Sequence, residues 1–193
     1  MKIIIYTITL IALFIFGCSK KTYLTDEIKA INPYKVGQRL VFESSDGLRN
    51  IIKITRVEEN RFPQGLGQFQ NERMVIIGFR ESQSIKYGTE ERIMTLIAKD
   101  DTNMGRIDFS ISLKDTYLRM DYIDADKFNK LSVMSIKTPY SSYDDVVNMN
   151  NTSQRKIFDD EIVEFFWSKS IGYVRLIQQN GIVWELVDLD IEP

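Results

Sequence analysis

The alternation of apolar and polar side chains is most regular between residues 106 and 113. Ile107, Phe109, Ile111 and Leu113 alternate there with arginine, aspartate and serine residues. Successive side chains of a β-strand point to opposite faces of the sheet, so one face of this segment is apolar and the other is polar. The pattern therefore predicts a half-buried strand.

Similar runs occur at short intervals along most of the chain, and they predict a protein that is mainly β. Further predicted strands cover residues 39–43, 50–57, 74–79, 93–98, 116–122, 130–137, 161–168, 171–178 and 182–189. Ser45-Asp46-Gly47 and Asn180-Gly181 predict the turns of two hairpins, because residues of these types accept a positive φ angle. Many antiparallel strands at such spacing indicate a sandwich or a partly open barrel.

Helices are expected to be few and short. Residues 25–31 fit one or two helical turns that end before Pro33. Ser142 and Asp145 have the spacing of an N-terminal capping box, which predicts a second short helix through Asn148. The expected fold is therefore an antiparallel sandwich or partly open barrel with one or two short helices.

The first residues of the chain have a different pattern, which is typical of an export signal. Lys2 provides a positive charge beside the amino terminus, and the run from Ile3 to Phe16 is uncharged and almost wholly apolar. That run is shorter than the roughly 20 residues that a helix needs to cross a bilayer, which favours a secretory signal peptide. An uncleaved N-terminal anchor helix is the alternative interpretation, and it would tether the chain to a membrane as well.

Ile15-Phe16-Gly17-Cys18 ends this run and resembles the lipobox of bacterial lipoproteins. Cys18 is also the single cysteine of the chain. The resemblance implies cleavage before Cys18 and attachment of lipid to it, and two or more acyl chains give stable membrane anchoring. We therefore assign residues 1–17 to the signal peptide, 18–32 to the lipidated cysteine and tether, and 33–193 to a single β-rich domain.

Two longer stretches resemble small envelope lipoproteins of Bacteroidetes. Residues 32–47 contain Asn-Pro-Tyr-Lys-Val-Gly and then Leu-Val-Phe-Glu-Ser before Asp-Gly, like the first hairpin of those proteins. Residues 165–186 contain Phe-Phe-Trp-Ser-Lys-Ser-Ile-Gly-Tyr-Val and then Trp-Glu-Leu, like their closing hairpin. The resemblance implies a turn or bulge at Gly172 and core positions for Trp167 and Trp184, and it implies no activity.

The residues after Cys18 bear on the membrane face that the protein occupies. Ser19-Lys20-Lys21-Thr22 begins the expected tether, and its two lysines would lie near lipid head groups. In Bacteroidetes lipoproteins, acidic residues after the cysteine mark export to the cell surface, whereas the residues here are basic. The resemblance therefore implies a place in the bacterial envelope, at the outer membrane, facing the periplasm rather than the outside.

Charge and composition exclude several classes of function. The chain has 25 Lys and Arg residues against 27 Asp and Glu residues, a net charge of −2, which argues against a nucleic-acid partner. It has no histidine, and the lipidation that the resemblance implies would occupy the cysteine, so the commonest general base and metal ligands would be missing. It contains no nucleophile elbow and no phosphate-binding glycine loop. We expect no enzymatic activity, no metal ion and no cofactor.

Clusters of carboxylates leave one enzymatic alternative, which is hydrolysis by a pair of acids. The clusters are Asp121, Asp124 and Asp126; Asp144 and Asp145; and Asp159, Asp160, Glu161 and Glu164. Phe128 stands where a calcium loop needs another oxygen ligand, and no glycine is present for the turn. We interpret the clusters as solvated turn acids. The successive Phe165, Phe166 and Trp167 are interpreted as core packing rather than as a ligand-stacking platform.

The stretch from Asn60 to Asn71 is the candidate site for a partner. It joins two predicted strands, and it is long for a hairpin connection, which usually takes about 2–5 residues. Pro63 is expected to interrupt strand pairing. Phe62, Leu66 and Phe69 are large apolar residues that a plain connection would not need. Either they cap an open end of the core, or they present an apolar patch to a partner or frame a cavity mouth.

Together, these observations favour a membrane-anchored lipoprotein that binds an envelope protein or serves as an accessory or structural component. The alternative is a carrier of an apolar small ligand inside a half-open barrel. A large apolar cavity would favour the carrier, whereas a filled core with an exposed apolar loop would favour protein binding.

Overall fold

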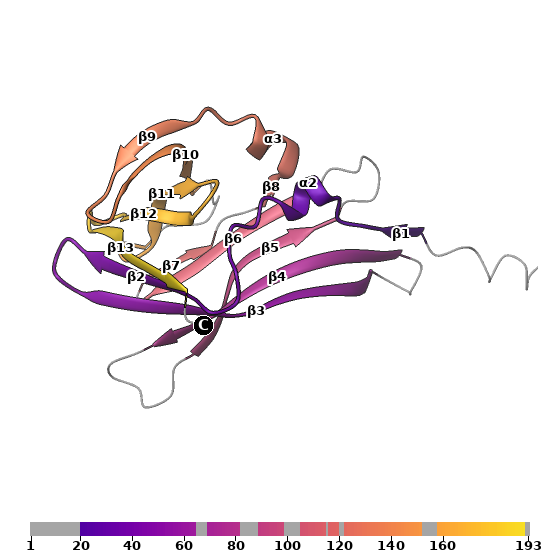
Figure 1. Ribbon diagram of the computed structural model, residues 1–193, viewed down its shortest axis with the longest axis horizontal. Helices are drawn as coiled ribbons and strands as arrows, with labels where there is room; N and C mark the ends of the chain where they lie inside the picture. The colour runs from indigo at the N-terminus through magenta and orange to yellow at the C-terminus, as the bar shows by residue number, and fades with distance from the viewer. Residues whose placement is uncertain are drawn as a thin grey trace, which may run out of the picture.

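The computed structural model describes residues 20–64, 69–81, 89–98, 105–114, 116–119, 122–151 and 158–191. These residues form one sheet of 13 strands and two short helices (Figure 1). In chain order the elements are β1 (Lys20–Thr22), α2 (Asp26–Lys29), β2 (Gln38–Ser44), β3 (Arg49–Gln64), β4 (Phe69–Glu81), β5 (Thr89–Ile97), β6 (Arg106–Leu113), β7 (Thr116–Arg119), β8 (Ile123–Asp124), α3 (Ala125–Asn129), β9 (Met134–Lys137), β10 (Ser142–Asn150), β11 (Ile162–Ser168), β12 (Gly172–Gln178) and β13 (Val183–Ile191).

The order of strands in the sheet follows the chain in two blocks. The order is β7-β6-β5-β4-β3-β2-β13-β12-β11-β10-β9, so the last strand, β13, pairs with β2 from the start of the domain. Neighbours along this path are antiparallel, whereas β1 pairs with β4 in parallel. The long strands β3 to β6 lie side by side, and β9 to β12 curl over toward β6 and β7 (Figure 1). This curled antiparallel half-barrel with two short helices confirms the predicted fold class.

Aromatic side chains fill the interior of the curled sheet. The ring centroid of Phe109 on β6 lies 5.8 Å from that of Phe128, 5.3 Å from Phe165, 4.8 Å from Trp167 and 6.3 Å from Tyr173. None of these five residues is more than 2% exposed. Each ring that is fully buried stabilises the fold by about 1.5–3 kcal/mol. The predicted core packing of Phe165 and Trp167 is thus confirmed.

The first of the two predicted helices is present. α2 begins after Thr25, whose side-chain oxygen accepts a hydrogen bond from the Ile28 N–H at 3.4 Å. Together with Leu24 and Ile31, Ile28 is buried against the sheet. The segment assigned to the tether, 18–32, therefore packs on the domain from Leu24 onward.

The second predicted helix is wrong, because the segment that starts at Ser142 is strand β10. β10 pairs with β11 on one side and with β9 on the other. Val146 and Val147 are fully buried in this pairing, and β-branched side chains favour strands over helices. Asp145, the supposed capping-box residue, accepts a hydrogen bond from the Ser170 N–H at 2.8 Å instead.

Tyr34 brings together the two stretches that resemble Bacteroidetes lipoproteins. Its phenol oxygen accepts a hydrogen bond from the Tyr173 N–H at 3.0 Å, and its ring meets Trp167 edge-on with centroids 5.7 Å apart. Gly172 has a φ of +95°, and a side chain there would run into the Tyr34 ring. The register between β11 and β12 also shifts near this point, between Phe166 and Trp167. The turn or bulge expected at Gly172 is therefore present, and glycine is required there by close packing.

The burial of Tyr34 and Tyr173 predicts a loss of stability in alkali. Burial raises the pKa of both phenols well above the usual value near 10. Above about pH 10 the unfolded chain therefore loses protons that the folded protein keeps. Each group should lower the free energy of unfolding by about 1.4 kcal/mol per pH unit. Urea unfolding between about pH 9 and pH 11 measures this slope. Tyr34→Phe should reduce this slope by the contribution of about one proton, because one phenol fewer titrates. An unchanged slope in the variant would contradict the prediction.

Candidate functional site

The candidate partner-binding stretch lies at one end of the long hairpin formed by β3 and β4. Phe62 pairs with Asn71 and Gln64 with Phe69, so both strands continue much further than the sequence indicated. The predicted long connection is therefore wrong, and the two strands are separated only by residues 65–68. Leu66 lies outside the described residues, as does Cys18.

Pro63 was expected to interrupt the hairpin, but the pairing continues through it. The reason is that Pro63 lies on an open edge of the sheet. Pro63 is opposite Gln70 in the register of β3 with β4. β2 pairs with β3 only from Arg49 to Lys53, so within the described part of the chain the other edge of β3 is unpaired at Pro63. A proline is tolerated on such an edge, since no neighbouring strand needs its missing N–H.

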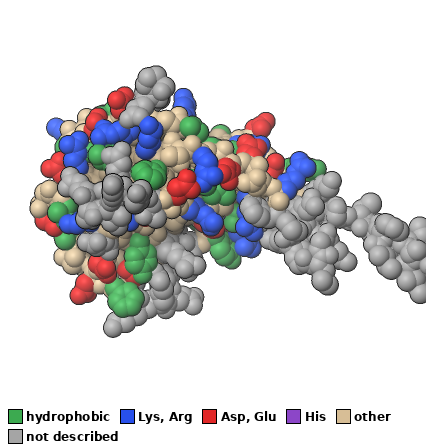
Figure 2. Space-filling model, turned by 90° about the horizontal axis from the view of Figure 1, so that it is seen from below, with side chains coloured by type: hydrophobic (Ala, Val, Ile, Leu, Met, Phe, Trp, Pro, Cys, Tyr) green, Lys and Arg blue, Asp and Glu red, His purple; other side chains and the backbone are tan. Residues whose placement is uncertain are grey.

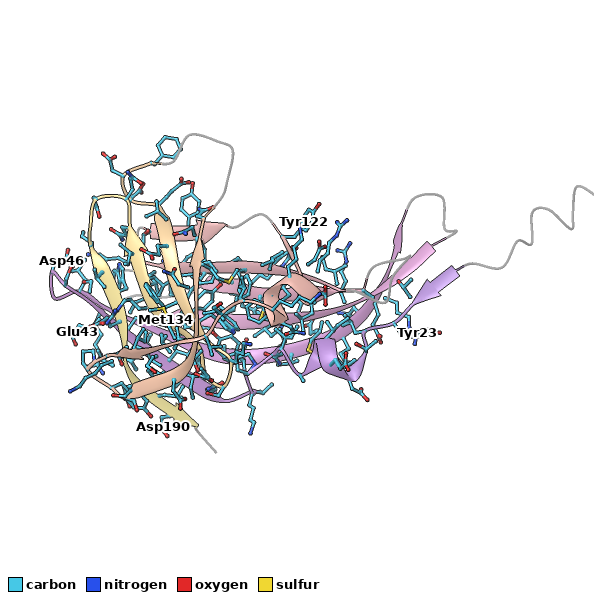
Figure 3. All side chains as sticks on the ribbon, turned by 90° about the horizontal axis from the view of Figure 1, so that it is seen from above. Tyr23, Glu43, Asp46, Tyr122, Met134 and Asp190 are labelled. Carbon is cyan, nitrogen blue, oxygen red and sulfur yellow. The ribbon has the colours of Figure 1, made fainter. Side chains whose placement is uncertain are left out.

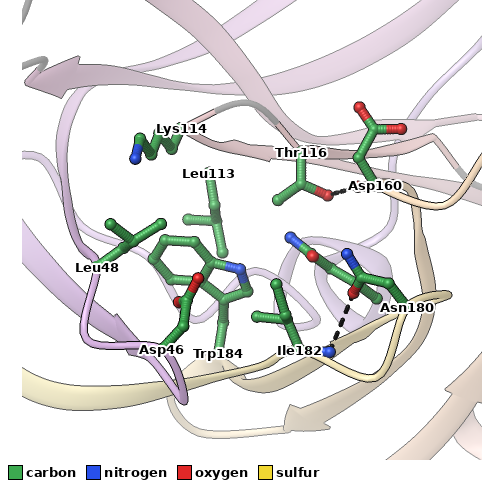
Figure 4. Close-up of a pocket in the computed structure, with 10 residues that line it drawn as sticks. Asp46, Leu48, Leu113, Lys114, Thr116, Asp160, Asn180, Ile182 and Trp184 are labelled. Atoms are coloured by element: carbon green, nitrogen blue, oxygen red, sulfur yellow. Dashed lines mark hydrogen bonds between the residues drawn. The ribbon is translucent and has the colours of Figure 1, made fainter.

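A pocket is present at the opposite end of β3, and we call it the turn-end pocket (Figure 4). It lies where the turn between β2 and β3 meets the turns that follow β6 and β12, and its volume is about 190 Å³. The residues that line it are Asp46, Leu48, Leu113, Lys114, Thr116, Asp160, Gln178, Asn180, Ile182 and Trp184. β3 has 16 residues, so the pocket and the hairpin end are separated by about 50 Å along the strand.

The turn-end pocket combines an apolar interior with a polar rim. Leu113 and Trp184 are almost fully buried, and the Trp184 Nε1–H has no hydrogen-bond partner among the described residues. Exposed side chains of both charges, Asp46, Lys114 and Asp160, surround it. The arrangement suits an amphipathic group of a partner, such as one side chain with its adjoining backbone.

Hydrogen bonds hold the rim residues in place. Lys114 has a φ of +50°, which is uncommon for a residue other than glycine. Its N–H donates to the Asn50 side-chain oxygen at 3.1 Å, and its carbonyl oxygen accepts from the Arg80 guanidinium. On the other side, the Thr116 hydroxyl donates to the Asp160 carbonyl oxygen, which joins β7 to the loop before β11. These hydrogen bonds hold the backbone of Lys114 and Asp160 in place without a bound partner.

The sequence did not identify this pocket, because its residues come from four segments that are distant in the chain. One partial signal was present: turn residues such as Asp46 and Asn180 are followed closely by the apolar residues Leu48 and Ile182. That signal is common in hairpins and does not show which turns meet. Phe158, which is 55% exposed and belongs to the same loop as Asp160, also gives no sequence pattern of its own.

The first carboxylate cluster takes part in ordinary surface ion pairs. Asp126 pairs with Lys130 at 2.7 Å along α3, and Asp124 lies 3.8 Å from Lys127. α3 itself was not predicted, because its five residues are too few for a helical pattern. Asp121 lies outside the described residues. Within the described ranges, no three acidic, histidine or cysteine side chains are grouped so that they could hold a metal ion.

Asp145 in the second cluster has a structural role. Burial raises the pKa of this carboxyl, but hydrogen bonds from Ser170 and Ser168 outweigh burial and leave the pKa below its usual range. A general acid needs a raised pKa, so this environment is the opposite of what acid catalysis requires. In the third cluster, Glu161 is 1% exposed and accepts a hydrogen bond from the Phe158 N–H at 3.1 Å.

The surface shows mixed charge rather than one patch. Basic and acidic side chains are interspersed over the face seen in Figure 2, with apolar side chains between them. Several charges are paired, including Arg56 with Glu90 at 2.6 Å and Arg175 with Glu185 at 2.5 Å. Nucleic acid would need a more concentrated basic surface.

Comparison with protein-family models, with curated proteins and with solved structures gives no match to this chain. None of the helices in the described residues has the length and hydrophobicity needed to cross a bilayer.

Proposed function

We propose that this protein is a membrane-anchored lipoprotein of the bacterial envelope that acts by binding another protein. The lipobox-like run that ends at Cys18 supports the anchor. The turn-end pocket is the part of the described surface that best suits a protein contact. In this proposal, the protein holds its partner at the membrane by contact and carries out no chemistry of its own.

The filled interior is the observation that supports protein binding over the alternative of an apolar-ligand carrier. A carrier needs an apolar cavity inside the half-barrel, and such sites have volumes of about 300–1,000 Å³. Here the Phe109 ring packs against four other buried rings in that space. The turn-end pocket, at about 190 Å³, is the right size for one side chain of a partner.

A double substitution of the pocket-lining Lys114 and of Phe158, which lies two residues before the pocket-lining Asp160, should weaken recovery of the partner. Lys114→Glu reverses a rim charge, and Phe158→Ser removes an exposed ring from the adjoining loop. Truncating a central aromatic residue of an interface commonly costs more than 1 kcal/mol. We expect the amount of partner that copurifies with the full-length protein from detergent-solubilised envelope to fall at least about tenfold, which is about 1.4 kcal/mol of binding free energy. Both residues are exposed, so the melting temperature should barely change.

Lys127→Glu combined with Val133→Ser is the matched control. Lys127 has a side chain that is 75% exposed and Val133 is 52% exposed, and neither lines the pocket. This control should recover as much partner as the wild type. Equal recovery by the rim variant would exclude the turn-end pocket as the binding site. A wild-type protein that recovers an apolar small molecule and no protein would overturn the proposed function.

A further inference from the structure

The first described strand places the start of the domain at the end of the long hairpin. β1 pairs with β4 in parallel, with Lys20 opposite Phe69 and Thr22 opposite Asn71. Phe69 is also paired with Gln64, at the last ladder position of β3 and β4. Three strands therefore end together here, and we call this region the hairpin end.

Only one residue separates Cys18 from Lys20 in the sequence, so covalent geometry limits how far a lipid on Cys18 can be from β1. Two residues span at most about 7 Å, even when they are fully extended. Lipid attached to Cys18 would therefore enter the bilayer within about 12 Å of Phe69, since Lys20 and Phe69 are on neighbouring strands. The sequence leaves no long connection between Cys18 and β1.

The chain after β1 is bound firmly to the same part of the sheet. The Leu24 N–H donates to the Glu72 carboxylate on β4 at 2.8 Å, and Lys29 pairs with Glu59 on β3 at 2.6 Å. Leu24 and Ile28 are both only 5% exposed. These contacts hold β1 against the hairpin end. A lipid anchor just before β1 would therefore be fixed relative to the rest of the domain.

Two described side chains at this end, Tyr23 and Arg61, are of types that favour the interface between water and lipid. Tyr23 is 53% exposed, and the Arg61 guanidinium lies 5.1 Å from the centre of its ring. Tyrosine has an apolar ring with a polar hydroxyl, and arginine can pair with phosphate while its stem covers apolar surface. Figure 3 places Tyr23 at the far end of the molecule from Asp46, which lines the turn-end pocket.

We infer that the hairpin end is a second membrane contact, which rests on the lipid head groups beside the lipidated Cys18. This inference depends on the lipid anchor of the proposed function. The protein would then stand on the membrane by the β3–β4 hairpin, and the length of β3 would hold the turn-end pocket up to about 50 Å from the bilayer surface. A partner would be bound at that height, clear of the head groups.

Fluorescence quenching in vesicles tests this contact. The full-length, lipidated protein is reconstituted into vesicles of phosphatidylethanolamine and phosphatidylglycerol that contain some lipid with a spin-labelled head group. Since Cys18 is the single cysteine and its sulfur carries lipid, an introduced cysteine is the only free thiol for a fluorophore. Gln64→Cys labels the hairpin end, and Gln179→Cys labels the turn between β12 and β13 as the matched control.

The expected result is quenching at position 64 that is at least about threefold stronger than at position 179, because the two sites are tens of ångströms apart. Equal quenching at both positions, in a protein that mass spectrometry shows to be lipidated and that stays on the vesicles, overturns this inference and leaves the anchor intact. A protein that carries no lipid and leaves the vesicles overturns both the inference and the proposed anchor.

Discussion

Replacing Gly172 with alanine is expected to destabilise the protein by about 2–5 kcal/mol. Gly172 has a φ of +95°, a conformation that costs other residues roughly 1–2 kcal/mol. The added Cβ would also lie 2.7 Å from Cε1 of Tyr34 and overlap the adjoining ring atoms. Tyr34 has little room to move, since it is buried and packs edge-on against Trp167. Overpacking of this kind adds about 1–3 kcal/mol.

Gly47→Ala is the control that separates the two effects. Gly47 has a similar φ of +84°, but no atom lies within 4 Å of the position that its Cβ would take. This variant should lose only the roughly 1–2 kcal/mol of the positive φ angle. Urea unfolding of the full chain in detergent, followed by the fluorescence of the buried Trp167 and Trp184, measures both. Equal losses in the two variants would show that the contact between Gly172 and Tyr34 is not tight.

Cys18→Ser should release the protein from the membrane almost completely or leave it as an uncleaved precursor. The sulfur of Cys18 is the proposed attachment point, and without lipid chains the domain has only weak contacts with head groups. Incorporation of a fatty-acid analogue in growing cells should fall to background in the variant. Ser19→Ala leaves the lipobox-like run unchanged and should label like the wild type. Equal labelling of Cys18→Ser and wild type would contradict lipidation at Cys18.

The alternating pattern was sufficient to predict the β class and most strands. Residues 106–113, where the alternation is strict, form β6 with the same bounds, and every second residue is buried. The pattern works there because one face of the strand meets the core and the other meets solvent. Gly47 and Gly181 also have the positive φ angles that the predicted turns require.

Local signals failed where contacts distant in the chain outweighed them. Ser142 and Asp145 match a capping box, but burial of Val146 and Val147 between β9 and β11 favours a strand. Capping contributes only about 1 kcal/mol, which is less than the burial of two valines. Pro63 likewise indicated a break, because the sequence does not show which edge of a strand stays open.

The candidate site was predicted only in part, for a similar reason. The unusual apolar content at Phe62 and Phe69 was visible in the sequence, and the structure places both residues in strands at the hairpin end. The pairing of β1 with β4, which brings Lys20 opposite Phe69, is indicated by no local pattern. The turn-end pocket depends on how far the sheet curls, and the curl is set by the packing of the whole core.

Photo-cross-linking in living cells tests most directly whether the pocket end of this protein binds another protein. A photoreactive amino acid is placed at Phe158, which is exposed and lies two residues before the pocket-lining Asp160, and in a second strain at Val133, which is exposed and distant in the sequence from every residue that lines the pocket. We predict a discrete cross-linked product of higher mass from position 158 and none from position 133. Absence of any product at position 158, or the same products from both positions at equal expression, would contradict the account.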